Sequence, residues 1–377
     1  MKLDVAKDTD HIDWFILLAV SGLMLFSIAF VYSASASFAE VKFGASDRMF
    51  WNHALRVVIG LAIILFFAKF DYRRLKKMSQ PILLAALGCL MLIFIIGTSA
   101  KGASRWIHLG PINFQPSEFA KFALVLHLSA LLADKQKYIR DFKQGLLPLL
   151  LWTGAVCGLI ALQPNFSTAF AIALISAALM FVGNVNLKHF AVMGSVALAG
   201  GALFAVSAAY RMRRLMAYFG AGDGTNEATV INYQLQQALL AFGSGGITGV
   251  GPGQSQQRNW YLPEAYGDFI FSIVGEEYGY IGVVAVLICF GIILWRGMLV
   301  ARRAPDDFGY FLATGITFTL ALYAFINAGV NSGILPTTGL PMPFISYGGT
   351  SVLFSAAAIG ILLNISSKAG VYPRKPK

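Results

Sequence analysis

An aspartate stands where an acidic, proline-containing loop meets a long apolar segment. The loop contains Pro263 and Glu264 and ends at Asp268, which is followed directly by Phe269 and Ile270. An aspartate at a helix start can accept hydrogen bonds from free backbone N–H groups and suits the helix dipole. A carboxylate at the mouth of a membrane cavity could equally act as a general base toward a hydroxyl group. Both roles stay open, and Asp268 is the candidate catalytic residue.

Two further carboxylates follow on the same predicted helix. Glu276 and Glu277 lie about 12 Å deeper than Asp268, and ionised groups at that depth must face protein or a wet cavity. At 100° per residue, Glu276 is about 80° round the helix from Asp268 and Glu277 is about opposite, so the three cannot share one substrate. We expect Glu276 and Glu264 to support the site without touching the substrate. We expect Glu277 to form a structural ion pair.

A buried charge pair is predicted near Pro116. Pro116 and Ser117 are helix-start signals, and Glu118 and Lys121 lie three residues apart, on one helix face. A local ion pair would explain the two charges. Because both fall inside an apolar segment, a part in lining a binding site is the alternative.

Other cations could hold a leaving phosphate. Lys101 and Arg105 lie beside Trp106, in a loop that could anchor the protein at a membrane interface or contact a substrate. Arg211 and Arg258 lie in a long loop further along the chain. Together with Lys121, these residues are the candidate ligands of a departing diphosphate.

A Gly-, Pro- and Asn-rich stretch covers residues 327–351 at predicted membrane depth. Non-helical backbone is tolerated there only when it is buried in protein or lines a cavity. We therefore expect a re-entrant loop against the active cleft, with Ser346 as a candidate substrate contact.

The elements that must position these residues are membrane helices. Hydrophobic residues make up 57% of the 377 residues and charged residues only 12%, which excludes an ordinary water-soluble domain. We predict an all-α integral membrane protein, a single polytopic domain over residues 1–377. About ten apolar segments are long enough to span a bilayer, near 14–32, 51–70, 80–97, 118–133, 145–162, 166–183, 188–208, 268–295, 308–327 and 349–366.

The positive charges predict the orientation. With a cytoplasmic N-terminus, 19 of the 29 Lys and Arg residues fall in cytoplasmic segments, so both termini are expected in the cytoplasm. The first apolar segment has no cleavage site and should remain as an anchor. The net charge of +11 therefore indicates orientation, and nucleic acid is not an expected partner.

The longest loop, residues 209–267, is expected outside the membrane between the seventh and eighth helices. Within it, apolar residues from Val230 to Phe242 recur at helical spacing and predict a short helix in the interface plane. Six glycines follow in the eleven residues 243–253. This glycine segment is either a flexible linker or a place of close backbone approach to a bulky ligand.

No metal or nucleophile site is predicted from spacing. The five histidines lack metal-ligand or triad partners at recognisable intervals, and the cysteines Cys89, Cys157 and Cys289 lie in apolar segments without paired spacing. No cofactor is expected with certainty. A divalent cation such as Mg²⁺ or Mn²⁺, which could neutralise a leaving diphosphate, stays open.

The chain resembles the SEDS family, named for shape, elongation, division and sporulation. The resemblance covers nearly the whole chain and rests on six stretches: Tyr32 to Ser35, Gln115 to Lys121, Gln163 to Thr168, Leu262 to Asp268, Glu276-Glu277 and Pro336 to Ser351. It implies a ten-helix peptidoglycan glycosyltransferase in the bacterial cytoplasmic membrane that polymerises lipid II on the outer side. It also implies a class B penicillin-binding protein as partner, with other division proteins nearby.

The resemblance also assigns residues. The essential loop aspartate of the family matches Asp268, and its fourth-helix Glu and Lys match Glu118 and Lys121. This chain departs from the family at Tyr266-Gly267, where His-Thr is common, and at Asn165, where Asp is common. The stretches 329–333 and 336–339 look more like the division branch than the elongation branch, which implies a septal location.

The resemblance leads to a mechanistic hypothesis. Asp268 deprotonates the GlcNAc 4-hydroxyl of lipid II, which attacks C1 of the lipid-linked donor strand with inversion, and undecaprenyl diphosphate leaves. Three alternatives stay open: a lipid II flippase, an elongation-type polymerase and a non-catalytic scaffold that recruits the penicillin-binding protein.

Overall fold

A computed structural model describes most of the chain. The described residues are 11–96, 98–100, 103–109, 112–186, 188–189, 191–192, 194–195, 226–259 and 261–370. Within them, eight helices are long and apolar enough to cross a membrane, and the apolar helix α6 (Phe166–Val182) is shorter. The span predicted at 188–208 and the loop residues 209–225 lie largely or wholly outside the described residues.

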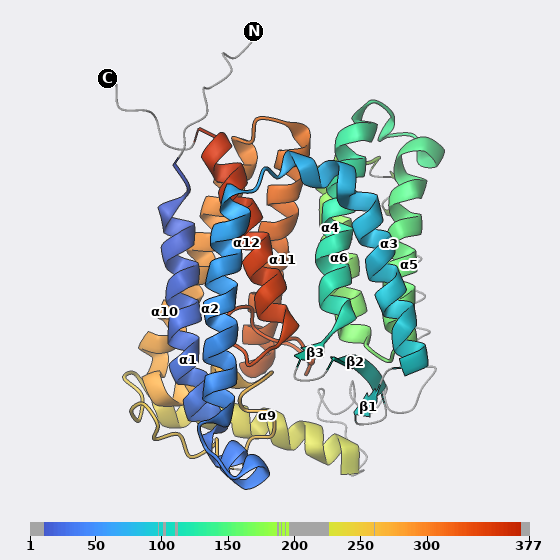
Figure 1. The fold of residues 1–377 in the computed structure, drawn as a ribbon. Helices are drawn as coiled ribbons and strands as arrows, with labels where there is room; N and C mark the ends of the chain where they lie inside the picture. Colours follow the sequence, from blue (N-terminus) through green and yellow to red (C-terminus); the bar gives the residue numbers. More distant parts are fainter. Residues whose placement is uncertain are drawn as a thin grey trace, which may run out of the picture.

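The helices run between two ends of one bundle (Figure 1). The described long membrane helices are α1 (Trp14–Phe43), α2 (Arg48–Lys69), α3 (Arg73–Ile96), α4 (Pro116–Lys135), α5 (Leu147–Leu162), α10 (Ile270–Arg302), α11 (Asp307–Asn331) and α12 (Thr350–Lys368), where the span of α5 includes the helical turn before it and covers Phe142–Leu162. A 3-10 turn, Gln136–Tyr138, and a π-helical turn, Phe142–Leu146, join α4 to α5.

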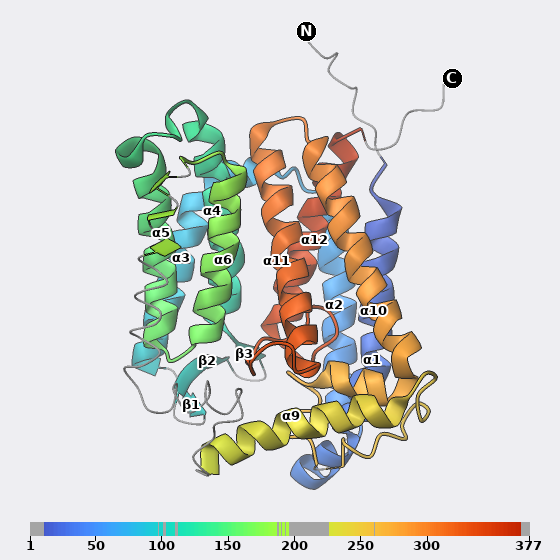
Figure 2. The ribbon, with the colours of Figure 1, turned by 180° about the vertical axis from the view of Figure 1, so that it is seen from behind.

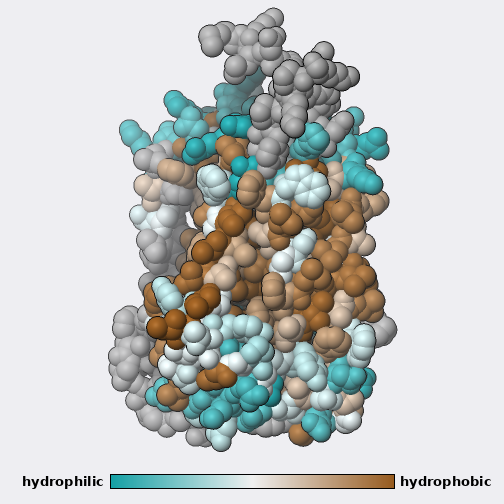
Figure 3. Space-filling model, turned by 90° about the vertical axis from the view of Figure 1, so that its left-hand side faces the viewer, coloured by the Kyte–Doolittle hydropathy of each residue, from teal (hydrophilic) through white to brown (hydrophobic). Residues whose placement is uncertain are grey.

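The surface has the layering expected of a membrane protein. Figure 3 shows a broad belt of hydrophobic residues between two hydrophilic ends on the face that it displays. The most apolar 18-residue window of α2 is only 22% buried inside the protein, whereas that of α4 is 78% buried and that of α11 is 72% buried. The chain is therefore an integral membrane protein whose centre is formed by α4 and α11.

The first turn of α1 and the last turn of α12 lie at the same end of the bundle (Figure 1). Asp13 caps α1 through the backbone N–H groups of Phe15 and Ile16. The fully buried Asp13 also accepts Arg296 at 2.6 Å, and its own N–H donates to Ser366 Oγ at 3.0 Å. These bonds tie α1, α10 and α12 together at what we call the terminal end.

The opposite end, called here the site end, carries a helix and a small sheet. Helix α9 (Asn226–Gly245) crosses this end of the bundle, as Figure 2 shows, which confirms the helix predicted around residues 230–242. Strands β1 (Thr98–Ala100), β2 (Ala103–Leu109) and β3 (Ile112–Phe114) form an antiparallel sheet in the order β1-β2-β3. The sequence analysis did not predict this sheet in the otherwise helical fold.

Helix α10 is broken at Gly279, and the glycine segment forms hydrogen bonds with the backbone groups that the break leaves unpaired within the helix. Gly279 has φ +65°, so the ordinary helical hydrogen bonds fail on both sides of it. The freed carbonyls of Glu276 and Glu277 accept Val250 N–H and Gly251 N–H, both at 3.0 Å. On the other side, Tyr280 N–H donates to Gly246 at 2.9 Å.

This packing requires glycine on both partners. A Cβ at Gly249 would lie 2.1 Å from the Glu277 carbonyl oxygen, and one at Gly245 would lie 2.0 Å from that of Gly275. At Gly245 and Gly249 the glycine segment is therefore held against α10 and does not act as a flexible linker. It is the place where the chain closely approaches its own backbone.

Candidate functional site

Asp268 is not the cap of α10. The helix begins at Ile270, and its N-cap residue Phe269 makes no side-chain capping hydrogen bond. The half-buried Asp268 lies one residue earlier, at the end of a turn at the site end. Asp268 therefore does not occupy the N-cap position that the capping alternative gives it.

The backbone around Asp268 is held on two sides. From α11, Asn327 and Asn331 donate their side-chain N–H groups to the Asp268 carbonyl oxygen at 2.8 and 3.0 Å. From the C-terminal loop, Ser346 Oγ donates to the Gly267 carbonyl at 2.8 Å, and Tyr347 N–H donates to the Tyr266 carbonyl at 2.9 Å. The turn is thus fixed between a central helix and the loop before α12.

The segment 332–349 is irregular, as expected, and it packs against the Asp268 turn. A Cβ built on Gly339 would lie 3.3 Å from Asp268 Oδ2, so this loop passes directly beside the carboxylate. Ser346 itself is 1% exposed and also accepts Met342 N–H at 2.8 Å. In this structure Ser346 positions the loop and does not present its hydroxyl as a substrate contact.

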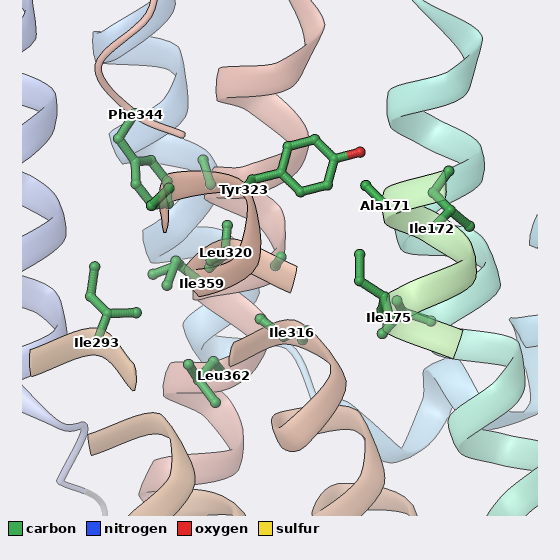
Figure 4. Close-up of a cluster of buried hydrophobic side chains, with 14 of the residues drawn as sticks. Ala171, Ile172, Ile175, Ile293, Ile316, Leu320, Tyr323, Phe344, Ile359 and Leu362 are labelled. Carbon is green, nitrogen blue, oxygen red and sulfur yellow. The ribbon is translucent and has the colours of Figure 1, made fainter. Parts of the chain in front are cut away.

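Glu118 and Lys121 form the predicted pair. Lys121 Nζ donates to Glu118 Oε2 at 2.8 Å, and the two residues are only 3% and 2% exposed, respectively. Lys121 Nζ also lies 3.8 Å from the ring centre of Tyr323. Figure 4 shows that ring directed from α11 toward Ala171 and Ile172 of α6.

One face of α11 joins this pair to Asp268. Tyr323, Asn327 and Asn331 lie four residues apart, so they share a helix face and are about 6 Å apart along the axis. Tyr323 contacts Lys121, and the two asparagines contact Asp268. The fold therefore brings a buried cation and the candidate base to the same stripe of α11.

The sequence analysis missed a cation, Arg56. Its guanidinium lies over the Tyr347 ring, 4.9 Å from the ring centre, and Tyr347 in turn contacts Tyr266, two residues before Asp268. Among the described residues, Arg56 Nη1 is buried without a hydrogen-bond partner. The available signal was a single arginine within the apolar segment 51–70, which is unusual inside a membrane.

Arg258 and the two glutamates of α10 form a separate network. Arg258 Nη1 donates to the Ser33 carbonyl at 3.1 Å and to Ser33 Oγ at 3.0 Å, and Ser33 donates to Glu277 Oε1. Glu276 accepts Gln256 N–H at 2.9 Å and the Ser255 hydroxyl. In this structure Arg258 and Glu276 thus hold the loop that precedes the Asp268 turn.

The remaining candidates are placed differently. Arg105, on β2, donates to the Pro164 carbonyl. Lys101 and Arg211 lie outside the described residues. Glu264 has φ +58° and helps to line a cavity of about 200 Å³ with Arg258 and Tyr266. Burial, followed by the nearby Glu264, raises the pKa of Tyr266 above its usual value.

The described residues contain no group of three or more His, Cys, Asp or Glu side chains that could hold a metal ion. The diphosphate of a lipid-linked substrate is a ligand of the kind that a divalent cation requires.

A polytopic membrane bundle with a fixed, half-buried carboxylate at one end defines the class of protein. The family model described as cell cycle protein, which covers FtsW, RodA and SpoVE, matches residues 13–370. The chain belongs to this family, the SEDS proteins, as its motifs predicted.

Similar proteins cover nearly the whole chain. It is 38% identical over 364 residues to the probable peptidoglycan glycosyltransferase FtsW of Geobacter sulfurreducens, with 96% of this chain and 97% of that protein aligned. It is 36% identical over 355 residues to stage V sporulation protein E of Bacillus subtilis, with 93% and 96% aligned.

Two solved structures share the fold. One belongs to a peptidoglycan synthase complex described as coordinating polymerization and crosslinking, with a TM-score of 0.77, 26% identity, and 95% of this chain and 98% of that chain covered. The other is the rod shape determining protein RodA of Thermus thermophilus, with a TM-score of 0.69, 25% identity, and 94% and 96% covered.

Proposed function

We propose that this protein is a peptidoglycan glycosyltransferase that polymerises lipid II during cell division. The supporting observation is the placement of Asp268, which is half-buried and fixed between α11 and the C-terminal loop in a chain that matches FtsW relatives along nearly its full length. The match to proteins named FtsW favours the division role over the elongation role.

Asp268 acts as the general base in this proposal. It takes the proton of the GlcNAc 4-hydroxyl of one lipid II, and the resulting oxygen attacks C1 of the lipid-linked donor. The C1–O bond to the diphosphate breaks with inversion, and undecaprenyl diphosphate leaves. A single base suffices, because a diphosphate is a good leaving group once its charge is neutralised.

Arg56 and Lys121 are the best-placed cations for that diphosphate among the described residues. Arg56 retains a buried N–H group without a partner, and Lys121 can exchange Glu118 for an anionic substrate. Arg105, Lys101 and Arg211 remain further candidates. A Mg²⁺ or Mn²⁺ ion bound by the diphosphate would supply the same charge neutralisation.

In this proposal the site end faces the outer side of the cytoplasmic membrane, and both termini lie in the cytoplasm. The loops at the terminal end carry Lys and Arg residues between α2 and α3, between α4 and α5 and after α10, which supports this orientation. The division role places the protein at the septum.

A class B penicillin-binding protein is the proposed partner. The solved relative from a peptidoglycan synthase complex that coordinates polymerization and crosslinking supports this assignment. Crosslinking of new strands requires a transpeptidase close to the polymerase, together with the other division proteins.

The decisive test is strand synthesis by the purified protein and its partner in vesicles that present lipid II on the accessible face. The wild type is expected to make polymer, and Asp268→Asn is expected to lose at least about 10²-fold in rate. The control Asp307→Asn, at the terminal end, should keep its rate. Transport of lipid II without polymer would favour a flippase, and polymer made equally well by Asp268→Asn would contradict the assigned base.

The scaffold alternative is tested by the growth of cells that carry the same variant. If the protein only recruits its partner, Asp268→Asn supports growth. If it is the polymerase, that variant fails to complement although it reaches the membrane. A fluorescent fusion that gathers along the side wall instead of the septum would contradict the division role.

A further inference from the structure

Two buried asparagines on α11 converge on the backbone of the candidate base. Asn327 is 1% exposed and Asn331 is fully buried. The Asn327 amide N–H groups donate both to Asp268 O and to Leu340 O, each at 2.8 Å. The Asn331 amide donates to Asp268 O at 3.0 Å and to Asn327 O at 2.9 Å.

Asn331 also performs the capping task that sequence reasoning gave to Asp268. Its Oδ1 accepts the backbone N–H of Ser272 at 3.1 Å and the Ser272 hydroxyl at 2.6 Å. Ser272 N–H lies in the first turn of α10 and also donates to the Phe269 carbonyl at 3.0 Å, so Asn331 Oδ1 is its second acceptor. The start of α10 is thus held from α11.

Asn327 connects the Asp268 turn to the loop segment around Leu340 that passes beside the carboxylate. One of its hydrogen bonds holds Asp268 itself, and the other holds Leu340, the neighbour of Gly339. A Cβ on Gly339 would lie 3.3 Å from Asp268 Oδ2. One side chain therefore fixes the distance between the Asp268 turn and the loop that passes beside its carboxylate.

We propose that Asn327 and Asn331 are positioning residues for the transfer reaction, which hold Asp268 by its carbonyl and thereby set where its carboxylate lies relative to the substrate hydroxyl. The inference rests on the proposed role of Asp268 as base. An amide suits the task because it donates two hydrogen bonds without a charge, whereas a carboxylate would repel the carbonyls. A misplacement of about 1 Å in a reacting group can cost about 10²-fold in rate.

The geometry can be tested without activity. In a background in which Cys89, Cys157 and Cys289 are replaced by serine, the pair Asp268→Cys and Gly339→Cys is expected to form a disulfide on mild oxidation. Asn327→Leu keeps the side-chain volume and removes the donors, so it should slow this reaction about fivefold, as expected for the loss of about 1 kcal/mol of hydrogen bonding.

The chain offers a matched control. Asn364 is also buried, at 4% exposed, and bridges backbone groups of Ala68 and Tyr72 at 2.9 and 3.0 Å. It lies in the last turns of α12, at the terminal end. Asn364→Leu therefore removes comparable hydrogen bonds but should leave the disulfide rate unchanged.

The consequence is tested by polymerisation kinetics. Asn327→Leu should lower kcat by about 10- to 100-fold with KM within about twofold, because substrate contacts remain and only the base is displaced. In the Asp268→Asn background the same substitution should change the residual rate by less than about twofold. Asn364→Leu should reduce both backgrounds equally, if at all.

Three results would overturn the inference. In the first, the parent cysteine pair does not crosslink, and in the second, Asn327→Leu and its control crosslink at equal rates. In the third, Asn327→Leu lowers the residual polymerisation rate of the Asp268→Asn variant by as much as it lowers the rate of the wild type. Failure of the base assignment looks different. In that case Asp268→Asn keeps its rate, while the crosslinking comparison still decides whether Asn327 sets the position of residue 268.

Discussion

Gly249→Ala should destabilise the protein through a contact between two backbones. Gly249 has φ +84°, and an added Cβ would lie 2.1 Å from the Glu277 carbonyl oxygen and 2.4 Å from its carbon. Neither partner can yield as a flexible side chain would. The glycine segment must therefore move away from the break in α10.

The cost has two parts. A left-handed conformation costs a residue with a side chain about 1–2 kcal/mol. Moving the segment also weakens the hydrogen bonds from Val250 and Gly251 to the α10 carbonyls, both now 3.0 Å long, at about 1 kcal/mol each. We expect a total of about 3–4 kcal/mol.

Gly253→Ala is the matched control. Gly253 has φ +76°, but nothing lies within 4 Å of a Cβ at this position, so only the conformational part should apply. The assay is thermal unfolding of the detergent-solubilised protein, with all three proteins measured under one condition. Equal losses of stability in the two variants would refute the contact between the glycine segment and α10.

Two further predictions concern charged groups. Burial raises the pKa of Asp306, but hydrogen bonds from Tyr72 and Gly309 and the ion pair with Arg73 together outweigh it and hold the pKa below its usual value. Stability from this group is thus present above about pH 4 and falls as pH drops through the lower folded-state pKa. Thermal unfolding against pH should show this loss in the wild type and less of it in Asp306→Asn. Arg56→Gln should lower polymerisation kcat/KM about 10- to 100-fold, whereas Arg48→Gln, whose guanidinium stacks on Phe43, should not; equal rates in the two would contradict a diphosphate role for Arg56.

Local patterns predicted much of the fold. Apolar segments indicated the membrane helices, helical spacing indicated α9, and the interval between Glu118 and Lys121 predicted their ion pair. Each of these features depends on residues that belong to one continuous segment of the chain. The family motifs pointed to the Asp268 turn for the same reason, because the turn is continuous in the sequence.

Contacts between distant segments were not predictable in this way. Ser33 and Glu277 are 244 residues apart, yet they share a hydrogen bond that fixes the loop before the site. Arg56 appeared as one charge in an apolar segment until the fold placed Tyr347 beneath it. The glycine segment gave no local sign of its partner, since the partner is the backbone of α10.

The sequence alone therefore determined the membrane class, the family and the carboxylate at the centre of the site. Only the tertiary structure decided how that residue is held, because Asn327 and Asn331 of another helix bind its backbone carbonyl. Hydropathy and helical periodicity act along the chain within a few residues. The direction of a side chain depends on hydrogen bonds from segments that meet only after folding.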